Sequence, residues 1–301
     1  MTKIGWTHWP GYIGVTINLT GGCERVHTGC KNCYAERMTF RLPHMGMLQY
    51  DGLAEKTASG VRFTGDVRLF PDVLGQIETW TKPRCVFVNS MSDLFQEKVQ
   101  KPFIFRAWSL METVNEHRRT IGQAPHIFLF LTKRPERMAA LWAEWVDVFV
   151  QGPNFPFSGF GFGCSVSDQK TAEMMIPPLL EIEHGFRFVS VEPMIGPTVI
   201  FKWLTKNNPA SKSDVDRWHG GTADRMQVAN GIDWCLVGCE SGPKRRPMEL
   251  DWARSIRYQC AEAGVPFYLK QLTDPRGRPI PLEQWPDDLR VQEFPKVGGG
   301  R

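Results

Sequence analysis

The sequence predicts an α/β protein built as a partial (β/α) barrel. Short runs rich in Val, Ile, Phe and Leu alternate with longer amphipathic stretches, a pattern typical of strands covered on both faces with helices between them. Seven such alternations in 301 residues suit one barrel-sized domain. A doubly wound sheet is the alternative, but no Gly-rich dinucleotide motif follows the first run, which weighs against it.

Each element is predicted from its own run of residues. The expected strands cover Tyr12–Asn18, Cys85–Asn89, His126–Leu131, Gly159–Ser165, Arg187–Val191, Trp234–Val237 and Pro266–Leu269. The expected helices cover Pro71–Thr81, Pro102–Glu116, Pro135–Trp145, Gln169–Glu183 and Leu250–Ala263. Gly264 is placed to end the last helix, because glycine accepts the left-handed conformation found there.

Two segments interrupt the alternation. Phe40–Val67 is polar and weakly periodic, and we expect it to cross the surface between the first two units. The polar segment 207–230, between the fifth and sixth strands, is a lid, a substrate-binding insertion or a plain loop. We therefore expect a barrel over residues 1–275 that contains this insertion, followed by a C-terminal extension over 276–301 with a flexible Gly-rich tail.

Composition and charge exclude several classes of protein. The 36 Lys and Arg against 32 Asp and Glu give a formal net charge of +4, which permits a nucleic-acid partner without arguing for one. No apolar run approaches the roughly 20 residues of a membrane helix, and the N-terminus lacks the apolar stretch of a signal peptide. We expect a cytoplasmic protein, in which the eight Cys are thiols or metal ligands rather than disulfides.

Three of these cysteines cluster directly after the first expected strand. Cys23, Cys30 and Cys33 stand where a barrel strand ends, which is the end at which barrel enzymes assemble their sites. Three thiolates so close together can hold a soft metal or an iron–sulfur cluster and leave one coordination position open. The alternative is a structural zinc site with His27 as the fourth ligand.

Polar residues follow the other strands at the same end. They fall in the segments 89–93, 132–134, 165–168, 190–192, 238–242 and 270–271. Any one of them can be a helix cap. Six in succession indicate a polar floor for a zwitterionic, hydroxyl-rich ligand, which a structural zinc does not need. This favours a catalytic cluster.

These motifs, in order from Trp6 to Gln271, give the sequence a specific resemblance. They run from Gly22 to Glu36, Phe87 to Phe95, Leu131 to Arg137, Gly163 to Gln169, Arg187 to Pro193, Val237 to Gly242 and Phe267 to Gln271. The chain resembles the phage-associated three-Cys-motif family, which is itself similar to radical S-adenosylmethionine (SAM) enzymes. The resemblance implies a 4Fe–4S cluster bound by Cys23, Cys30 and Cys33, with SAM chelating the fourth iron. An electron from an external donor then cleaves SAM to methionine and a 5′-deoxyadenosyl radical, which abstracts a substrate hydrogen.

The resemblance also assigns site residues by position. For cofactor binding it implies Asn89, Ser90 and Ser92 at the SAM amino group, Ser165 and Ser167 at the ribose, and Lys133 and Arg134 at the SAM carboxylate or a substrate phosphate. Lys270 is a further candidate for that carboxylate or phosphate, and Glu192 and Glu240 are candidates for SAM or substrate polar atoms. Cys239, beside Glu240, is either a small buried hydrophobe or a thiol near the radical. Each polar residue has an ordinary salt-bridged barrel residue as its alternative.

Two departures from the radical SAM pattern bear on these roles. Six residues separate Cys23 from Cys30, where the usual spacing is three. The aromatic residue that usually precedes the third cysteine, near adenine, is replaced by Asn32, and Tyr34 follows instead. We therefore take Tyr34 as the candidate for the adenine contact.

The substrate is less defined. Lys244, Arg245 and Arg246, with basic residues at 206, 212, 217 and 225, form either a phosphate-binding rim or a solvated patch. Phage association suggests modification of a nucleic-acid base, such as a thymine derivative, flipped out of the stack. The alternatives are a radical SAM enzyme acting on a peptide or small metabolite, and a non-catalytic, zinc-stapled nucleic-acid-binding or interaction protein.

Overall fold

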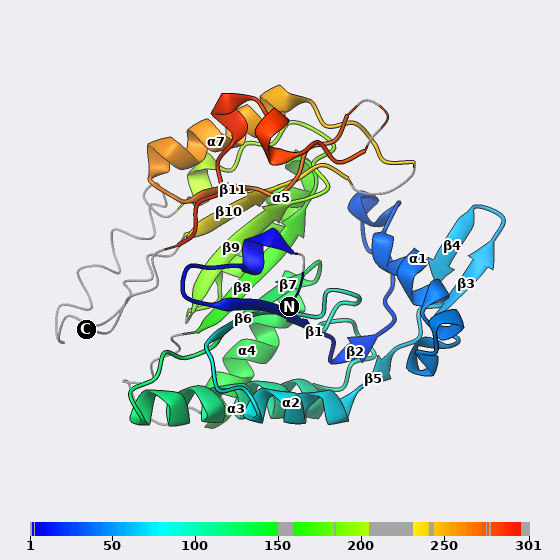
Figure 1. Cartoon of the computed structure of the whole chain (residues 1–301), viewed down its shortest axis with the longest axis vertical. Helices are drawn as coiled ribbons and strands as arrows, with labels where there is room; N and C mark the ends of the chain where they lie inside the picture. The colour runs from blue at the N-terminus through cyan, green and yellow to red at the C-terminus, as the bar shows by residue number, and fades with distance from the viewer. Residues whose placement is uncertain are drawn as a thin grey trace. The chain divides into compact units, whose positions relative to one another are not determined.

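A computed structural model describes most of the chain (Figure 1). It covers residues 2, 4–149, 159–183, 185–204, 231–240, 244–274, 276 and 278–295. The predicted insertion 207–230 and the Gly-rich tail therefore lie outside the described residues. Contacts divide the chain into two compact units, Met1–Gly161 and Phe162–Arg301. The boundary falls inside a strand, β8 (Phe160–Val166).

Seven strands form the main sheet, and their order follows the chain. The sheet runs β1 (Ile13–Ile17), β6 (Arg84–Val88), β7 (Ile127–Thr132), β8, β9 (Phe186–Val191), β10 (Trp234–Val237) and β11 (Phe267–Leu269). Pairing is parallel from β1 through β6 to β7 and from β9 through β10 to β11. A doubly wound sheet would reverse its order part-way. The partial (β/α) barrel is therefore confirmed, and all seven predicted strands appear within two residues of their expected ends.

In the unit Met1–Gly161, three helices lie together on one side of the strands (Figure 1). They are α2 (Gly75–Glu78), α3 (Lys101–Thr120) and α4 (Pro135–Phe149). Where the sequence predicted one helix over Pro71–Thr81, the structure has a 3-10 turn over Pro71–Leu74 followed directly by the short α2. Helix α3 runs four residues past its predicted end because Arg118 is buried and donates hydrogen bonds to the carbonyls of Ala124 and Thr81.

The segment Phe40–Val67, expected only to cross the surface, contains secondary structure that the sequence did not predict. Helix α1 (Tyr34–Arg41) packs against a hairpin of β3 (Ala54–Thr57) and β4 (Gly60–Phe63), and two short 3-10 turns lie between them. Strand β2 (Thr20–Gly21) pairs with β5 (Arg68–Leu69). Leu42, Tyr50 and Leu53 form a small core under these elements, with Met38, Phe70 and Met91 packed against it. We call residues 34–69 the α1 lobe; its strands are too short for a period-2 pattern to reveal them.

In the unit Phe162–Arg301, two described helices flank the strands. Helix α5 (Gln169–Leu180) begins with a capping box between Asp168 and Thr171. Helix α7 (Leu250–Ala263) ends at Gly264, whose φ of 65° is left-handed, as predicted. Across the whole described part of the chain, no helix is both long enough and apolar enough to pass through a bilayer.

The C-terminal extension is ordered against the sheet over residues 278–295. It runs antiparallel to the edge strand β11, with Leu269 N donating to Val291 O and Glu293 N donating to Phe267 O, each at 2.9 Å. Two residues of this segment, Trp285 and Leu289, are buried. This segment therefore satisfies the backbone groups of β11 that the sheet leaves unpaired.

Candidate functional site

The cysteine loop begins at a glycine that no other residue can replace without strain. Gly22 has a φ of 81°, and a Cβ added there would lie 2.0 Å from the carbonyl oxygen of Asp66. A 3-10 turn covers Thr28–Cys30, and its N-cap His27 accepts a hydrogen bond from Gly29 N through Nδ1 at 3.0 Å. Cys33 is the N-cap residue of α1. All three cysteines are free thiols held on one short segment.

Burial affects the protonation of two of these thiols, Cys23 and Cys33. It raises the pKa of Cys23 to about 12, with a further rise from Asp93, while Arg134 lowers it. It also raises the pKa of Cys33, which Lys133 and the backbone amides of Ala35 and Glu36 lower. Among the described residues, no three His, Cys, Asp or Glu side chains are already gathered in a metal-binding group. The donor set nevertheless suits a soft, thiolate-ligated group, because metal ligation displaces the thiol proton and the adjacent cations stabilise the resulting charge.

Arg134 connects the loop after β7 to the cysteine loop. Its Nη1 lies 3.2 Å from Asp93 Oδ2 and 4.0 Å from Cys23 Sγ, and its Nη2 donates to Glu24 O at 3.4 Å. The side chains of Arg134 and Asp93 are 8% and 9% exposed. Asp93 also accepts hydrogen bonds from Thr132 Oγ1 at 2.7 Å and from Lys133 N at 3.1 Å. A buried, oriented cation thus lies against the first cysteine.

A second ion pair closes the other end of the cysteine loop. Arg25 binds Glu36 through two hydrogen bonds of 2.7 and 2.5 Å, and the Glu36 side chain is 2% exposed. The hydrogen bonds that Arg25 donates to Glu36 raise the pKa of Arg25, and Cys33 and Cys30 raise it further. Since Glu36 lies in the first turn of α1, this pair ties the loop to the helix that follows Cys33.

The polar residues after β6 tie the loop that leaves β1 to the loop that leaves β6. Asn89 is buried with a φ of 62°, and it receives a hydrogen bond from Leu19 N at 2.8 Å. Its Nδ2 donates to Thr20 Oγ1 at 2.6 Å and to Ser92 Oγ at 3.0 Å. Ser90 Oγ donates to Asn18 Oδ1 at 3.3 Å. Asn89 therefore positions the start of the cysteine loop, and its contact with the SAM amino group stays a prediction.

Tyr34 lies at the start of α1, directly after the third cysteine. Its hydroxyl donates to the carbonyl oxygen of Ser90, while 42% of the residue remains exposed. The ring is thereby fixed at one end beside the cysteine loop. Its contact with adenine stays a prediction.

A separate polar cluster lies within the unit Phe162–Arg301. Lys270 Nζ lies 2.7 Å from Glu192 Oε2 and 2.9 Å from Ser190 Oγ. Gln271 Nε2 donates to Glu192 Oε1 at 3.4 Å and to Cys239 O at 2.9 Å. The Glu192 side chain is 28% exposed and that of Lys270 is 8% exposed. The structure thus joins two of the predicted site residues, Glu192 and Lys270, in one ion pair, and the carboxylate of Glu192 stays partly open to solvent.

Three neighbours of this cluster differ in chemical character. Ser165 Oγ donates to Glu192 O at 3.0 Å, and the buried Ser167 Oγ has no hydrogen-bond partner among the described residues. Cys239 is 2% exposed, and burial raises its pKa to about 11. At neutral pH this thiol is protonated, as expected of the small buried hydrophobe rather than a reactive nucleophile.

The carboxylate of Glu240, another predicted site residue, is bound by Arg246. Arg246 binds both carboxylate oxygens of Glu240, at 2.5 Å through Nη2 and 3.1 Å through Nε, and its backbone N donates to Oε2 at 2.7 Å. Arg245 Nη2 donates to Arg276 O at 2.5 Å. Arg245 and Arg246, which were expected in a phosphate-binding rim, therefore bind other groups of the protein. The other expected rim residues at 206, 212, 217 and 225 lie outside the described residues.

Comparison with known proteins identifies one family. The family described as "Protein of unknown function (DUF5131)" matches residues 1–278. The chain belongs to this family. No curated protein and no solved structure matches it. The match includes the cysteine loop, the α1 lobe and both ion pairs of the loop, so these features lie within the DUF5131 portion of the chain.

Sequence reasoning missed three residues of this DUF5131 site. Asp93, Glu36 and Arg25 are the groups that hold Arg134 and the cysteine loop in place. Asp93 and Glu36 stand inside the motifs that carried the resemblance, so their position was a signal. Their partners lie 41 and 11 residues away in the chain, and no spacing rule pairs them.

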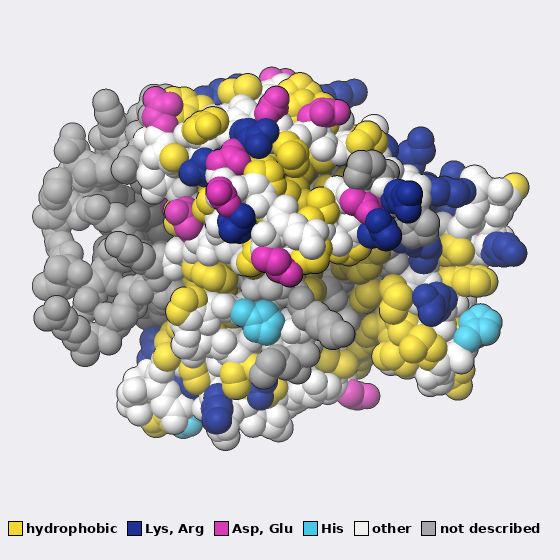
Figure 2. Space-filling view, turned by 45° about the horizontal axis from the view of Figure 1, so that its top comes forward, with side chains coloured by type: hydrophobic (Ala, Val, Ile, Leu, Met, Phe, Trp, Pro, Cys, Tyr) yellow, Lys and Arg dark blue, Asp and Glu magenta, His cyan; other side chains and the backbone are white. Residues whose placement is uncertain are grey.

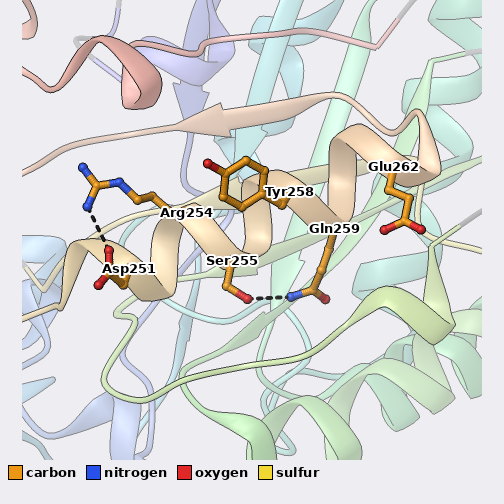
Figure 3. Close-up of a pocket in the computed structure, with 6 residues that line it drawn as sticks. All are labelled: Asp251, Arg254, Ser255, Tyr258, Gln259 and Glu262. Atoms are coloured by element: carbon orange, nitrogen blue, oxygen red, sulfur yellow. Dashed lines mark hydrogen bonds and ion pairs between the residues drawn. The ribbon is translucent and has the colours of Figure 1, made fainter.

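The hollow on the outer face of α7 contains none of the predicted site residues (Figure 3). Its lining comes from that helix alone: Asp251, Arg254, Ser255, Tyr258, Gln259 and Glu262. Arg254 is bound by Asp251 at 2.9 Å and by Asp288 at 2.7 Å, and Ser255 Oγ lies 3.2 Å from Gln259 Nε2. These side chains bind one another, so the hollow is not a candidate active site.

Proposed function

We propose that this DUF5131 protein is a radical SAM enzyme in which Cys23, Cys30 and Cys33 hold a 4Fe–4S cluster. The observation that carries the proposal is the cysteine loop itself: three free thiols on eleven residues, with the buried Arg134–Asp93 pair against the first of them. Nearby charge and hydrogen bonds to sulfur tune the potential of a redox cluster, so the cation would have a function there beyond structural support.

In this proposal the protein's own residues orient and shield the site. Arg134 fixes Cys23 and places positive charge beside it, while Arg25 and Glu36 fix the chain around Cys33. Asn89 and Ser92 hold the start of the loop through Thr20. When bound, the cluster supplies the electron that cleaves SAM and yields a carbon radical able to abstract a substrate hydrogen.

The Glu192–Lys270 pair is the proposed binding site for polar atoms of SAM or substrate in its unit. The exposed edge of Glu192 accepts hydrogen bonds from an amino or hydroxyl group, and Lys270 holds that carboxylate in place at 2.7 Å. Glu240 is assigned a structural part, because Arg246 already binds both of its oxygens.

For the substrate, we propose a nucleic-acid base, with reducing electrons from an external donor protein. The support is the resemblance to the phage-associated family, and the net charge of +4 permits such a partner. A base in a duplex must leave the stack to reach a protein interior, so single-stranded or locally opened substrate is favoured. A peptide or small metabolite is the alternative substrate.

The first test is the metal content of protein purified without oxygen. Wild type should be brown, absorb broadly near 400 nm and hold about four irons per chain. Cys30→Ala should lose both properties, whereas the matched variant Cys85→Ala, at a buried thiol in β6, should keep them. With dithionite and SAM, wild type should form 5′-deoxyadenosine. A colourless protein with one zinc after attempted cluster reconstitution would remove the radical mechanism.

A further inference from the structure

The exposed face of α1 carries positive charge directly beside the cysteine loop. Residues three and four apart share a helix face, so Tyr34, Arg37 and Arg41 form one stripe that starts next to Cys33. Tyr34 and Arg41 are exposed, Arg37 is half-buried, and the exposed Lys31 precedes the stripe in the loop. In Figure 2 dark-blue Lys and Arg side chains and yellow hydrophobic ones gather over the α1 lobe at the right of the view. The stripe thus runs from the cysteine loop along the solvent-facing side of α1.

These cations are not neutralised within the described part of the protein. Lys31, Arg37 and Arg41 make no ion pair with any described carboxylate. The one acid of α1, Glu36, is buried against Arg25. On the hairpin, Glu55 lies opposite Arg62 in the strand register. Arg37 and Arg41 therefore place two positive charges on the α1 face beside the cysteine loop, while Lys56 and Arg68, which likewise form no ion pair with a described carboxylate, lie on β3 and β5.

The remaining groups along the stripe are apolar and solvent-facing. Met45 is 64% exposed and Leu48 is 70% exposed, both just beyond the C-terminus of α1. At the other end the Tyr34 ring is partly exposed while its hydroxyl is bound to Ser90 O. Aromatic rings beside cations, on a rigid helix, are the arrangement with which proteins bind the bases and phosphates of single strands.

We propose that the exposed face of α1 binds the sugar–phosphate backbone of a single-stranded or locally opened polynucleotide, next to the base that is modified. Arg37 and Arg41 lie one helical turn apart, about 6 Å along the axis, and each guanidinium pairs with a phosphate through two hydrogen bonds. The partly exposed Tyr34 ring offers a face on which a neighbouring base stacks, and in this proposal that contact replaces the adenine contact that the resemblance implies. This inference rests on the proposed function and names where its substrate docks, on the α1 lobe instead of the predicted rim at 244–246.

The test measures binding of a fluorescein-labelled 20-nucleotide single strand by anisotropy, with the full-length protein, between 50 and 200 mM salt. Arg37→Gln combined with Arg41→Gln should weaken binding roughly ten- to thirty-fold at 100 mM salt. It should also flatten the dependence of log affinity on log salt by about 1.4, because each lost phosphate contact contributes about 0.7. The matched control, Lys82→Gln with Arg106→Gln, removes the same charge from exposed positions elsewhere in the unit and should bind within twofold of wild type.

Three further measurements separate the possible results. Circular dichroism melting should show the double variant folded, and Arg37→Lys with Arg41→Lys should recover most of the affinity. Equal weakening in the Gln variant and the matched control, or a wild type that does not bind, overturns the docking proposal. Formation of 5′-deoxyadenosine without polynucleotide should be unchanged in the Gln variant. If it forms while docking fails, the radical chemistry stands and only the substrate assignment falls.

Discussion

Arg134 Nη1 lies 3.2 Å from Asp93 Oδ2 and 4.0 Å from Cys23 Sγ, so one guanidinium joins a buried carboxylate to the first cysteine of the loop. Asp93 and Cys23 raise the pKa of Arg134 against the lowering effect of burial. The guanidinium therefore keeps its charge in a poorly hydrated place. We propose that Arg134 positions Cys23, and its contact with the SAM carboxylate or a substrate phosphate stays a prediction.

Replacing Arg134 should damage both the fold and the cluster. Arg134→Gln leaves the buried Asp93 carboxylate without its cation, which should lower the free energy of unfolding by about 3 kcal/mol, as measured by urea denaturation of the apoprotein. Arg134→Gln combined with Asp93→Asn should recover part of that loss. In the loaded protein the single variant should lower the cluster's reduction potential, because a positive charge beside a thiolate ligand is gone. An unchanged potential would show that Arg134 does not act on Cys23.

Gly22 should be irreplaceable for a local reason. Gly22→Ala adds a Cβ 2.0 Å from Asp66 O at a φ of 81°, whereas Gly11→Ala meets nothing within 4 Å at a φ of 82°. Both variants incur the left-handed strain of roughly 1–2 kcal/mol, and only Gly22→Ala must also move the chain that leads into Cys23. Gly22→Ala should therefore melt lower than Gly11→Ala and retain fewer irons. Equal iron content in the two variants would contradict this account of the loop.

The Glu192–Lys270 pair should matter for turnover more than for folding. Glu192→Gln keeps the shape of the side chain but removes the charge that Lys270 binds at 2.7 Å. We expect the rate of 5′-deoxyadenosine formation to fall ten- to a hundredfold, as is typical for a lost charged contact of about 1.4 to 2.7 kcal/mol in the transition state. Glu240→Gln is the control, since Arg246 occupies that carboxylate, and it should change the melting temperature more than the rate. The reverse pattern would exchange the roles of the two residues.

Cys239 should be dispensable for the chemistry. Its thiol is buried and burial holds its pKa near 11, so almost none is thiolate at neutral pH. Cys239→Ala should keep about four irons per chain and form 5′-deoxyadenosine at a rate within threefold of wild type. Loss of activity with the cluster intact would instead make Cys239 a thiol of the reaction, the other role that the sequence left open.

Acid should destabilise the protein through His126. Burial, together with the smaller effects of Arg118 and Arg84, lowers the pKa of His126 from its ordinary value of 6.5 to about 4. Its Nδ1 accepts a hydrogen bond from Arg84 N at 3.1 Å. The folded state therefore binds fewer protons than the unfolded state between these values, and stability is lost as pH falls from about 6.5 to 4. The loss amounts to at most about 3 kcal/mol.

The control for this prediction is a comparison of wild type with His126→Gln, because the pH dependence of one protein alone includes other titrating groups. Unfolding in urea at several pH values should show a steeper loss for wild type than for His126→Gln over the same range. Glu112 has the opposite sign, because burial raises its pKa to about 7 and its contribution weakens as pH rises. Both proteins share Glu112, so the difference isolates His126. Parallel curves would mean that His126 is already protonated or exposed in the folded state.

The sequence by itself determined the order of the seven strands, the cysteine loop and the left-handed end of α7. These follow from local signals: apolar runs of strand length, cysteines within eleven residues, and a glycine after a helix. The α1 lobe escaped that reasoning because its strands are two to four residues long, and their pairing is set by contacts with α1 and the small core of Leu42, Tyr50 and Leu53.

Only the tertiary structure decided which polar residues meet. It joined Asp93 to Arg134, Arg25 to Glu36 and Glu192 to Lys270, and it gave Glu240 to Arg246. Each pair forms because a buried charge is too costly unless an opposite charge reaches it, and which one reaches it depends on chain packing in three dimensions. The cations that we propose for docking, Arg37 and Arg41, likewise come from the structure of the α1 lobe, whereas the sequence predicted a basic rim at 244–246.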